Sequence, residues 1–128
     1  KAAKYVENDC DAVDINLGCP QGIAKKGHYG SFLLEETDLI VSMVTKLKEN
    51  LKVPVTCKIR CLPKEEDTLA LARAIEKAGA SLLTVHGRTR DHNKQTVGPA
   101  NWAIIRRIKQ ELSIPVICNG GISTCDDI

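Results

Sequence analysis

The feature that most constrains the fold of this chain is an alternation of segments typical of β-strands with segments typical of α-helices. In the strand-like segments one set of alternate side chains is mostly apolar and the other is mostly polar; these are residues 12–18, 53–60, 81–87 and 114–121. Between them, apolar residues recur at helical spacing over 37–50, over 67–78 and around Trp102, Ile105, Ile108 and Leu112, and a short helix is expected at 2–8. The helix over 67–78 is expected to start from an N-cap at Asp67 and to stop at Gly79. Strands separated by single helices form β-α units and therefore a parallel sheet.

Two α/β folds contain such units, the open doubly wound sheet and the (β/α)8 TIM barrel. A doubly wound sheet is covered by helices on both faces, so its strands read as continuous apolar runs. In this chain one face of each strand becomes more polar towards the carboxyl end, as expected where side chains line the mouth of a barrel. The pattern favours a (β/α)8 barrel, of which the four β-α units supply about half.

Polar side chains near the carboxyl ends of the strands are predicted to meet at the barrel mouth. They are Asn16, Lys58, Arg60, His86, Arg88 and Asn119. The alternative is that Lys58 and Arg60 line the exposed face of an edge strand, which explains one strand but not four. Lys58 could hold an anionic cofactor, form a Schiff base or pair with Asp14, and His86 could bind a ligand or shuttle protons. A structural role for each of them is the alternative.

A cysteine on a rigid turn follows the first strand. Gly18, Cys19 and Pro20 are consecutive, and proline fixes its own φ and restricts the residue before it. A thiol held in this way can act as a nucleophile or as a proton donor. The alternative is a small buried side chain.

A glycine-rich turn follows the last strand, at Asn119, Gly120 and Gly121. Without side chains, backbone N–H groups can approach a phosphate closely, and a helix that starts nearby adds a favourable dipole. The alternative is an ordinary turn.

Composition excludes some classes of function and leaves others open. The net charge of +2 is too small to indicate nucleic-acid binding by itself, and no apolar run approaches the length needed to cross a membrane. The six cysteines form no C-x-x-C pair. We expect them to be small apolar residues in a reduced, intracellular protein, although Cys57 and Cys61 could pair as metal ligands.

Five motifs, taken together and in this order, resemble the tRNA-dihydrouridine synthases, in particular the eukaryotic-type subfamily that modifies the D-loop of tRNA. They are "NLGCPQ", "AKKGHYGSFLL", "VTCKIR", "TVHGRTR" and "CNGGI", and the resemblance extends over essentially the whole chain. It implies a (β/α)8 barrel that binds FMN, uses NADPH as reductant and converts uridine in tRNA to 5,6-dihydrouridine. It also implies an intracellular location, cytoplasmic or nuclear, with tRNA as the partner; no protein or membrane partner is predicted.

The resemblance implies a role for each candidate residue. Cys19 corresponds to the catalytic acid that protonates C5 of the uracil, while reduced FMN delivers hydride to C6. The residues implied for FMN are Lys58 and His86, with Asn119, Gly120 and Gly121 on the phosphate side. Asn16 corresponds to the residue that reaches the substrate base, and Arg60 and Arg88 are expected to contact substrate or phosphate. Residues 18–30 are expected to form a flexible basic lid with Lys25 and Lys26 near tRNA phosphates; the alternative for these lysines is a solvated loop.

Relative to that family, residues 1–128 are expected to be the central part of the catalytic barrel, without its first strands, its last strand and the C-terminal helical domain. We expect the isolated segment to be inactive. Two other functions remain open: a different FMN-dependent barrel oxidoreductase acting on a small molecule, and a non-catalytic tRNA-binding protein. The first predicts flavin binding without a need for tRNA, and the second predicts tRNA binding that survives loss of flavin or of the thiol.

Overall fold

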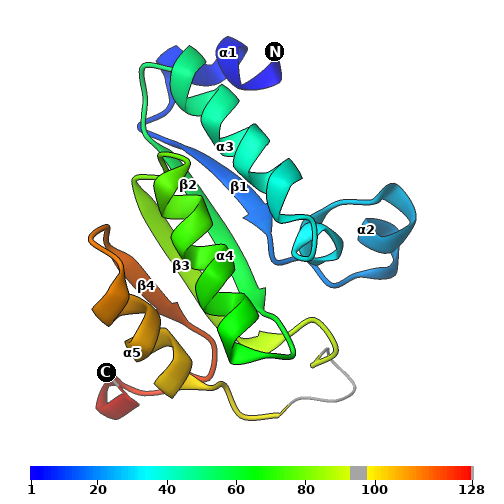
Figure 1. The fold of residues 1–128 in the computed structure, drawn as a ribbon, viewed down its shortest axis with the longest axis vertical. Coiled ribbons are helices and arrows are strands. Elements are labelled where there is room, and N and C mark those ends of the chain that lie inside the picture. Colours follow the sequence, from blue (N-terminus) through cyan, green and yellow to red (C-terminus); the bar gives the residue numbers. More distant parts are fainter. Residues whose placement is uncertain (93–97, 128) are drawn as a thin grey trace.

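Four parallel strands form a single sheet in the residues that the computed structural model describes, 1–92 and 98–127. Each strand pairs with the next one along the chain, in the order β1-β2-β3-β4 (Figure 1). The strands are β1 Val13–Leu17, β2 Val55–Cys61, β3 Leu82–Thr89 and β4 Val116–Asn119. The α-helices are α1 Ala2–Val6, α2 Gly22–Gly27, α3 Thr37–Asn50, α4 Glu65–Lys77 and α5 Trp102–Glu111, and short 3₁₀ turns are η1 Glu7–Asp9, η2 Gly30–Leu33 and η3 Cys125–Asp127.

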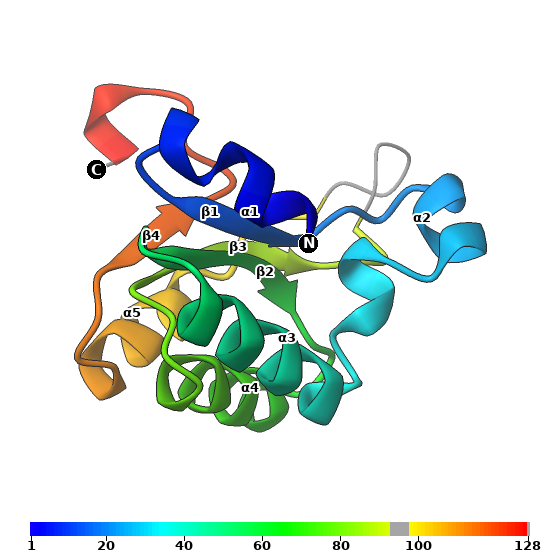
Figure 2. The ribbon, with the colours of Figure 1, turned by 90° about the horizontal axis from the view of Figure 1, so that it is seen from above.

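This arrangement is that of consecutive units of a (β/α)8 barrel. In a doubly wound sheet the strand order reverses and helices cover both faces. Here the order is sequential, and α3, α4 and α5 lie side by side on one face of the sheet (Figure 2). The fold class predicted from the polar and apolar strand faces is therefore confirmed.

The apolar faces of the strands and helices form one core between them. Its completely buried members include Ile40, Val44, Val55, Cys57, Ile59, Ile75, Leu83, Val85 and Ile108. Full burial of one such aliphatic side chain contributes about 1.5–3 kcal/mol to stability, so this layer fixes the sheet against the helices. Cys118, on the face of β4 that the alternation predicts to be apolar, is exposed, and β4 is an edge strand of the described sheet.

Two helical segments differ from the prediction. α4 begins at Glu65, so Asp67 lies in the first turn, where a negative charge favours the helix dipole, and is not the N-cap. The predicted loop between β1 and α3 contains α2 and η2, and Ala24 of α2 is completely buried. A six-residue helix is too short to show a helical repeat in the sequence, which explains why it was missed.

The cysteines agree only in part with the expectation of small apolar residues, because Cys10 and Cys19 are half-buried and Cys118 and Cys125 are exposed. All six are free thiols, and Cys57 and Cys61 are buried. Burial raises the pKa of Cys57 to about 12 and that of Cys61 to about 11, so both are protonated at neutral pH. Within residues 1–92 and 98–127 no group of three or more His, Cys, Asp or Glu side chains could hold a metal ion, and the metal-ligand alternative for this pair is not supported. The helices found in these same ranges are all too short or too polar to cross a membrane.

A carboxylate of α4 fixes the loop that leads into β4. Glu76 Oε1 accepts hydrogen bonds from the backbone N–H groups of Ser113 (2.7 Å) and Ile114 (3.0 Å). The loop is thereby attached to the helix layer just before the strand that carries Asn119.

We predict that Glu76→Ala lowers the free energy of unfolding by about 1–2 kcal/mol, because two backbone donors lose their charged acceptor. Glu49→Ala, at an exposed position of α3, is the control and should change stability by less than about 0.5 kcal/mol. Denaturant unfolding of the full-length protein measures both. Equal stabilities of the two variants would contradict the role given to Glu76.

Candidate functional site

The strand register brings the predicted rim residues together on one face of the sheet. Asn16 pairs with Lys58 across β1 and β2, and His86 pairs with Arg60 on one side and with Asn119 on the other. All lie near the carboxyl ends of parallel strands, which meet at one edge. Four strands thus contribute polar side chains to one place, as the alternation of their faces indicates. The roles of these residues remain predictions.

Lys58 reaches across the sheet to Asn119. Its Nζ donates a hydrogen bond of 2.9 Å to Asn119 Oδ1. Burial lowers the pKa of Lys58, repulsion by Arg60 adds to this, and the charge of Asp14 acts in the opposite direction. Asp14 itself accepts a hydrogen bond of 2.7 Å from Thr56 Oγ1, so its influence on Lys58 is through charge and the direct partner of the amine is Asn119.

His86 is neutral at physiological pH. Burial first, and then the charges of Arg60, Lys58 and Arg88, lower its pKa to about 4. Its Nε2 lies 3.4 Å from Nη1 of Arg88. Because a guanidinium can only donate, Nε2 is the acceptor and the ring proton sits on Nδ1. This ring can therefore offer an N–H to a ligand, and at neutral pH it does not serve as an imidazolium acid.

The glycine-rich turn is built against His86. Gly120 and Gly121 have φ values of +94° and +80°, which L side chains rarely adopt. A Cβ at Gly120 would lie 2.5 Å from Cδ2 of His86, and Trp102 Nε1 donates a hydrogen bond of 2.9 Å to the Gly120 carbonyl. The turn follows β4 directly, where the sequence predicts a phosphate-binding turn.

Three residues expected to contact substrate or phosphate form side-chain hydrogen bonds with backbone groups of the surrounding loops. Arg60 Nε donates to the Gly18 carbonyl (2.8 Å), and its Nη1 donates to the carbonyls of Thr89 (2.9 Å) and His92 (3.1 Å). Asn16 Oδ1 accepts from the Gly18 N–H at 3.0 Å. Arg88 Nε donates to the Gly98 carbonyl at 2.6 Å. These bonds fix the loops at the rim, a role that the sequence pattern did not predict.

Cys19 lies half-buried on the loop that follows β1. Its carbonyl oxygen accepts two hydrogen bonds from Ser31, one from the backbone N–H (3.0 Å) and one from the hydroxyl (2.9 Å). Gly30 has a φ of +65°, and a Cβ there would lie 2.7 Å from the same oxygen. Sequence analysis missed Gly30 and Ser31. The adjacent glycine and serine shortly after the Cys-Pro turn were the available signal.

The comparisons with known proteins agree with the motifs. A family model described as dihydrouridine synthase (Dus) matches residues 1–128. A Saccharomyces cerevisiae protein named tRNA-dihydrouridine(16/17) synthase [NAD(P)(+)] is 54% identical over 99% of the chain and 30% of its own length. A Mus musculus protein, tRNA-dihydrouridine(16/17) synthase [NAD(P)(+)]-like, is 48% identical over 100% of the chain and 27% of its own length. The Escherichia coli tRNA-dihydrouridine synthase B is 39% identical over 92% of the chain and 37% of its own length. The chain thus spans about a third of the length of these curated relatives.

We predict that His86 shows no titration step near pH 6.5 and takes up a proton only as the pH falls towards about 4. The imidazolium is disfavoured by burial and by three neighbouring cations, so the folded pKa lies below the unfolded one and protonation destabilises the native state as the pH decreases. NMR of the ¹⁵N-labelled imidazole in the full-length protein measures this pKa and also reports an unprotonated Nε2. A midpoint near 6.5, or a proton on Nε2 at pH 7, would contradict the geometry.

Proposed function

Because the chain belongs to the dihydrouridine synthase family, we propose that the protein reduces uridine to 5,6-dihydrouridine in the D-loop of tRNA. The family model covers all 128 residues. The names of the mouse and yeast relatives carry "(16/17)" and "[NAD(P)(+)]", so we propose positions 16 and 17 as the targets and NADPH as the reductant. A tRNA substrate implies an intracellular protein, in the cytoplasm or the nucleus.

The observation that carries this proposal is that a thiol and a cluster of cations lie at the same rim, with the thiol on a turn held by hydrogen bonds. Cys19 follows β1, and Lys58, Arg60 and Arg88 lie on the polar faces of the two neighbouring strands. Arg60 is directly bonded to the residue before Cys19 and interacts electrostatically with its sulfur. A proton donor next to an anion-binding surface suits the reduction of a base that is bound beside an anionic cofactor.

The donor set at the rim fits FMN. It combines the Lys58 ammonium, the Asn119 amide and the neutral His86, whose protonated Nδ1 can donate. We propose that Lys58 and His86 contact the flavin ring and that Asn119, Gly120 and Gly121 lie on its phosphate side, where two glycines leave the backbone accessible. When bound, FMN supplies the hydride that C6 of the uracil receives.

Cys19 supplies the proton in this proposal. Its S–H bond breaks as the C5–H bond forms, and the positive charge of Arg60 stabilises the thiolate that remains. A fixed donor removes the entropic cost of bringing an acid to the base. Asn16 is proposed to orient the base: because its Oδ1 accepts from the Gly18 N–H, its Nδ2 is the group that can donate to a uracil carbonyl.

The tRNA backbone is proposed to lie over α2 and the rim. Lys25 and Lys26 are both exposed in the last turn of α2, which Figure 1 shows beyond the carboxyl end of β1. Arg60 and Arg88 are proposed to use their outer N–H groups for substrate or phosphate. The target base has to leave its stack to reach Cys19, as in other enzymes that act on a nucleobase.

We predict that Cys19→Ala slows reoxidation of the reduced flavin by unmodified tRNA by about 10²–10⁴-fold, the usual contribution of a positioned general acid. Rapid mixing of the pre-reduced full-length protein with saturating tRNA measures this rate. Cys10→Ala is the matched control, because Cys10 precedes β1 and so lies at the opposite end of the strand, and it should react at the parent rate.

Each alternative has its own outcome in the same experiment. Bound flavin that a small enone reoxidises and tRNA does not would favour the small-molecule oxidoreductase. Tight tRNA binding by a protein without flavin would favour the non-catalytic binder. Equal rates for Cys19→Ala and the parent would remove Cys19 as the proton donor.

We predict that Gly120→Ala weakens flavin binding roughly tenfold, because a side chain at φ +94° is strained and its Cβ would displace His86. Gly22→Ala is the control for flavin content, since a Cβ at Gly22 meets no atom within 4 Å. Flavin absorbance of the purified full-length proteins and titration of the stripped proteins with FMN give the two affinities. Parent-like affinity of Gly120→Ala would contradict a flavin site at this turn.

A further inference from the structure

We propose that Ser31, held in place by Arg90 and Glu35, is a positioning residue that fixes the thiol of Cys19 for proton transfer. The proposal rests on the proposed function, in which Cys19 is the proton donor. It adds residues that lie outside the polar faces of the strands and to which nothing in the comparisons gives a role.

The first step is the bond between Ser31 and Cys19. Ser31 is completely buried, and both its N–H and its hydroxyl donate to the Cys19 carbonyl oxygen. This fixes the peptide plane that follows Cys19, and Pro20 fixes the next φ angle. With the backbone held, the sulfur of Cys19 can move only by rotation about χ1, so the backbone limits it to the positions of the staggered rotamers.

The second step is that the Cys19 loop is fastened on two consecutive carbonyls. β1 ends at Leu17, so the carbonyls of Gly18 and Cys19 lie beyond the strand. Arg60 from β2 donates a hydrogen bond to the Gly18 carbonyl, and Ser31 from η2 donates to the Cys19 carbonyl. Removal of either side chain weakens the attachment of the loop that carries the thiol; without the Ser31 hydroxyl, the Cys19 carbonyl keeps only the backbone N–H of residue 31.

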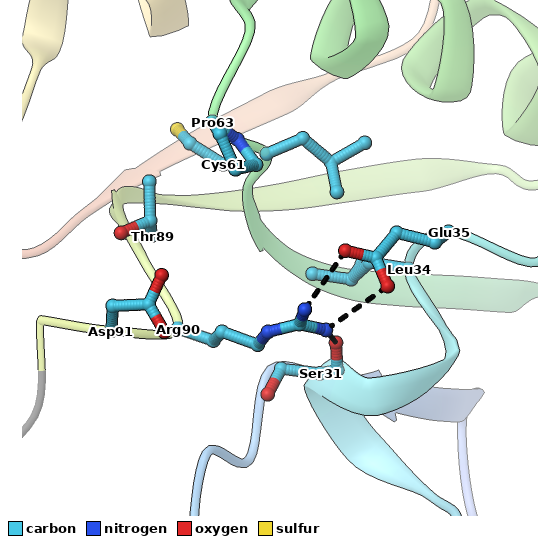
Figure 3. A pocket seen from close by; sticks show the side chains of 9 residues that line it. Ser31, Leu34, Glu35, Cys61, Pro63, Thr89, Arg90 and Asp91 are labelled. Carbon is cyan, nitrogen blue, oxygen red and sulfur yellow. Dashed lines mark hydrogen bonds and ion pairs between the residues drawn. The ribbon is translucent and has the colours of Figure 1, made fainter.

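The third step is the contact that holds η2. Arg90 follows β3 and makes a forked ion pair with Glu35, with N–O distances of 2.8 and 3.3 Å. Its Nη1 lies 3.5 Å from the Ser31 carbonyl, and its guanidinium carbon lies 5.4 Å from the centre of the Phe32 ring. Figure 3 shows Arg90 between Ser31 and Glu35. One arginine at the end of β3 thus contacts three residues in or directly after η2.

The charge of Arg90 is balanced by Glu35, unlike the charges of the lysines that are proposed to bind tRNA. Arg90 and Glu35 neutralise each other through two parallel bonds, a geometry that lysine cannot reproduce. The planar guanidinium also lies over an aromatic ring. These contacts position η2 and, through Ser31, the loop that carries Cys19.

The test compares Ser31→Ala with Ser31→Thr in the full-length protein, with Ser81→Ala as control at the opposite end of the sheet, before β3. In Ser31→Ala we expect flavin reoxidation at saturating tRNA to slow roughly tenfold, with unchanged tRNA affinity and flavin content. Ser31→Thr keeps the hydroxyl and should recover most of the parent rate. A parent-like rate in Ser31→Ala, or a loss confined to tRNA affinity, would overturn the proposal.

A second readout does not depend on catalysis. Alkylation by iodoacetamide, followed residue by residue by mass spectrometry, should be several-fold faster at Cys19 in Ser31→Ala, because the Cys19 carbonyl keeps the backbone N–H bond from residue 31 but loses the hydroxyl bond. The buried Cys57 and Cys61 report general loosening and should stay unreactive. Equal alkylation of Cys19 in parent and variant, or equal acceleration at all three thiols, would overturn the positioning role. If instead Cys19→Ala reacts with tRNA like the parent, Cys19 is not the proton donor, while the alkylation contrast still decides whether Ser31 fixes the loop.

Arg90→Lys is the milder second variant, since Arg90 is partly exposed and lysine keeps the charge but loses the fork. We expect roughly threefold faster alkylation of Cys19, with no further effect when Glu35→Gln is added. Arg73→Lys, at the ion pair of Arg73 with Glu111 on the helix layer, is the matched control and should leave Cys19 unchanged. Additive effects of Arg90→Lys and Glu35→Gln would show that the pair does not act as one contact on η2.

Discussion

Parallel pairing of the four strands, with polar side chains in register, is the constraint on which the rest of this structure depends. His86 has Arg60 opposite it on one side and Asn119 on the other, and Asn16 has Lys58 opposite it. A shift of one residue in any strand would turn its polar side chains into the helix layer. The buried faces against α3, α4 and α5 resist such a shift, so the apolar core determines the geometry of the site.

The electrostatics of the rim follow from the close approach of its cationic side chains. Lys58, Arg60 and Arg88 lie around His86 and hold it in the neutral form, and burial acts in the same direction. Such a cluster of cations is costly without an anion, which supports the proposal of a phosphorylated cofactor and a nucleic acid substrate at this rim. A neutral histidine is a poor proton donor, and the acid that we propose is the thiol of Cys19, on a loop whose carbonyls are bonded by Arg60 and Ser31.

The sequence was sufficient for the fold class, for the order of the elements and for the set of polar rim residues, because strand alternation and helical spacing are local properties of the chain. It was insufficient for α2 and η2, which are too short to show a period, and for the partners of the rim side chains. The bond between Lys58 and Asn119 crosses β3, and the bonds of Arg60 end on Gly18 after β1 and on Thr89 and His92 at and just beyond the end of β3. Arg90 meets Ser31 and Glu35 through tertiary packing of segments far apart in the chain, so residue spacing could not predict this contact.

The central claim is that the protein reduces uridine in tRNA, and its most direct test is the mass of the tRNA itself. Unmodified tRNA is incubated with the full-length protein and NADPH, digested, and analysed by mass spectrometry nucleotide by nucleotide. The account predicts that a uridine of the D-loop, at position 16 or 17, gains the mass of two hydrogen atoms. Unchanged tRNA from a protein that contains flavin and oxidises NADPH would contradict it.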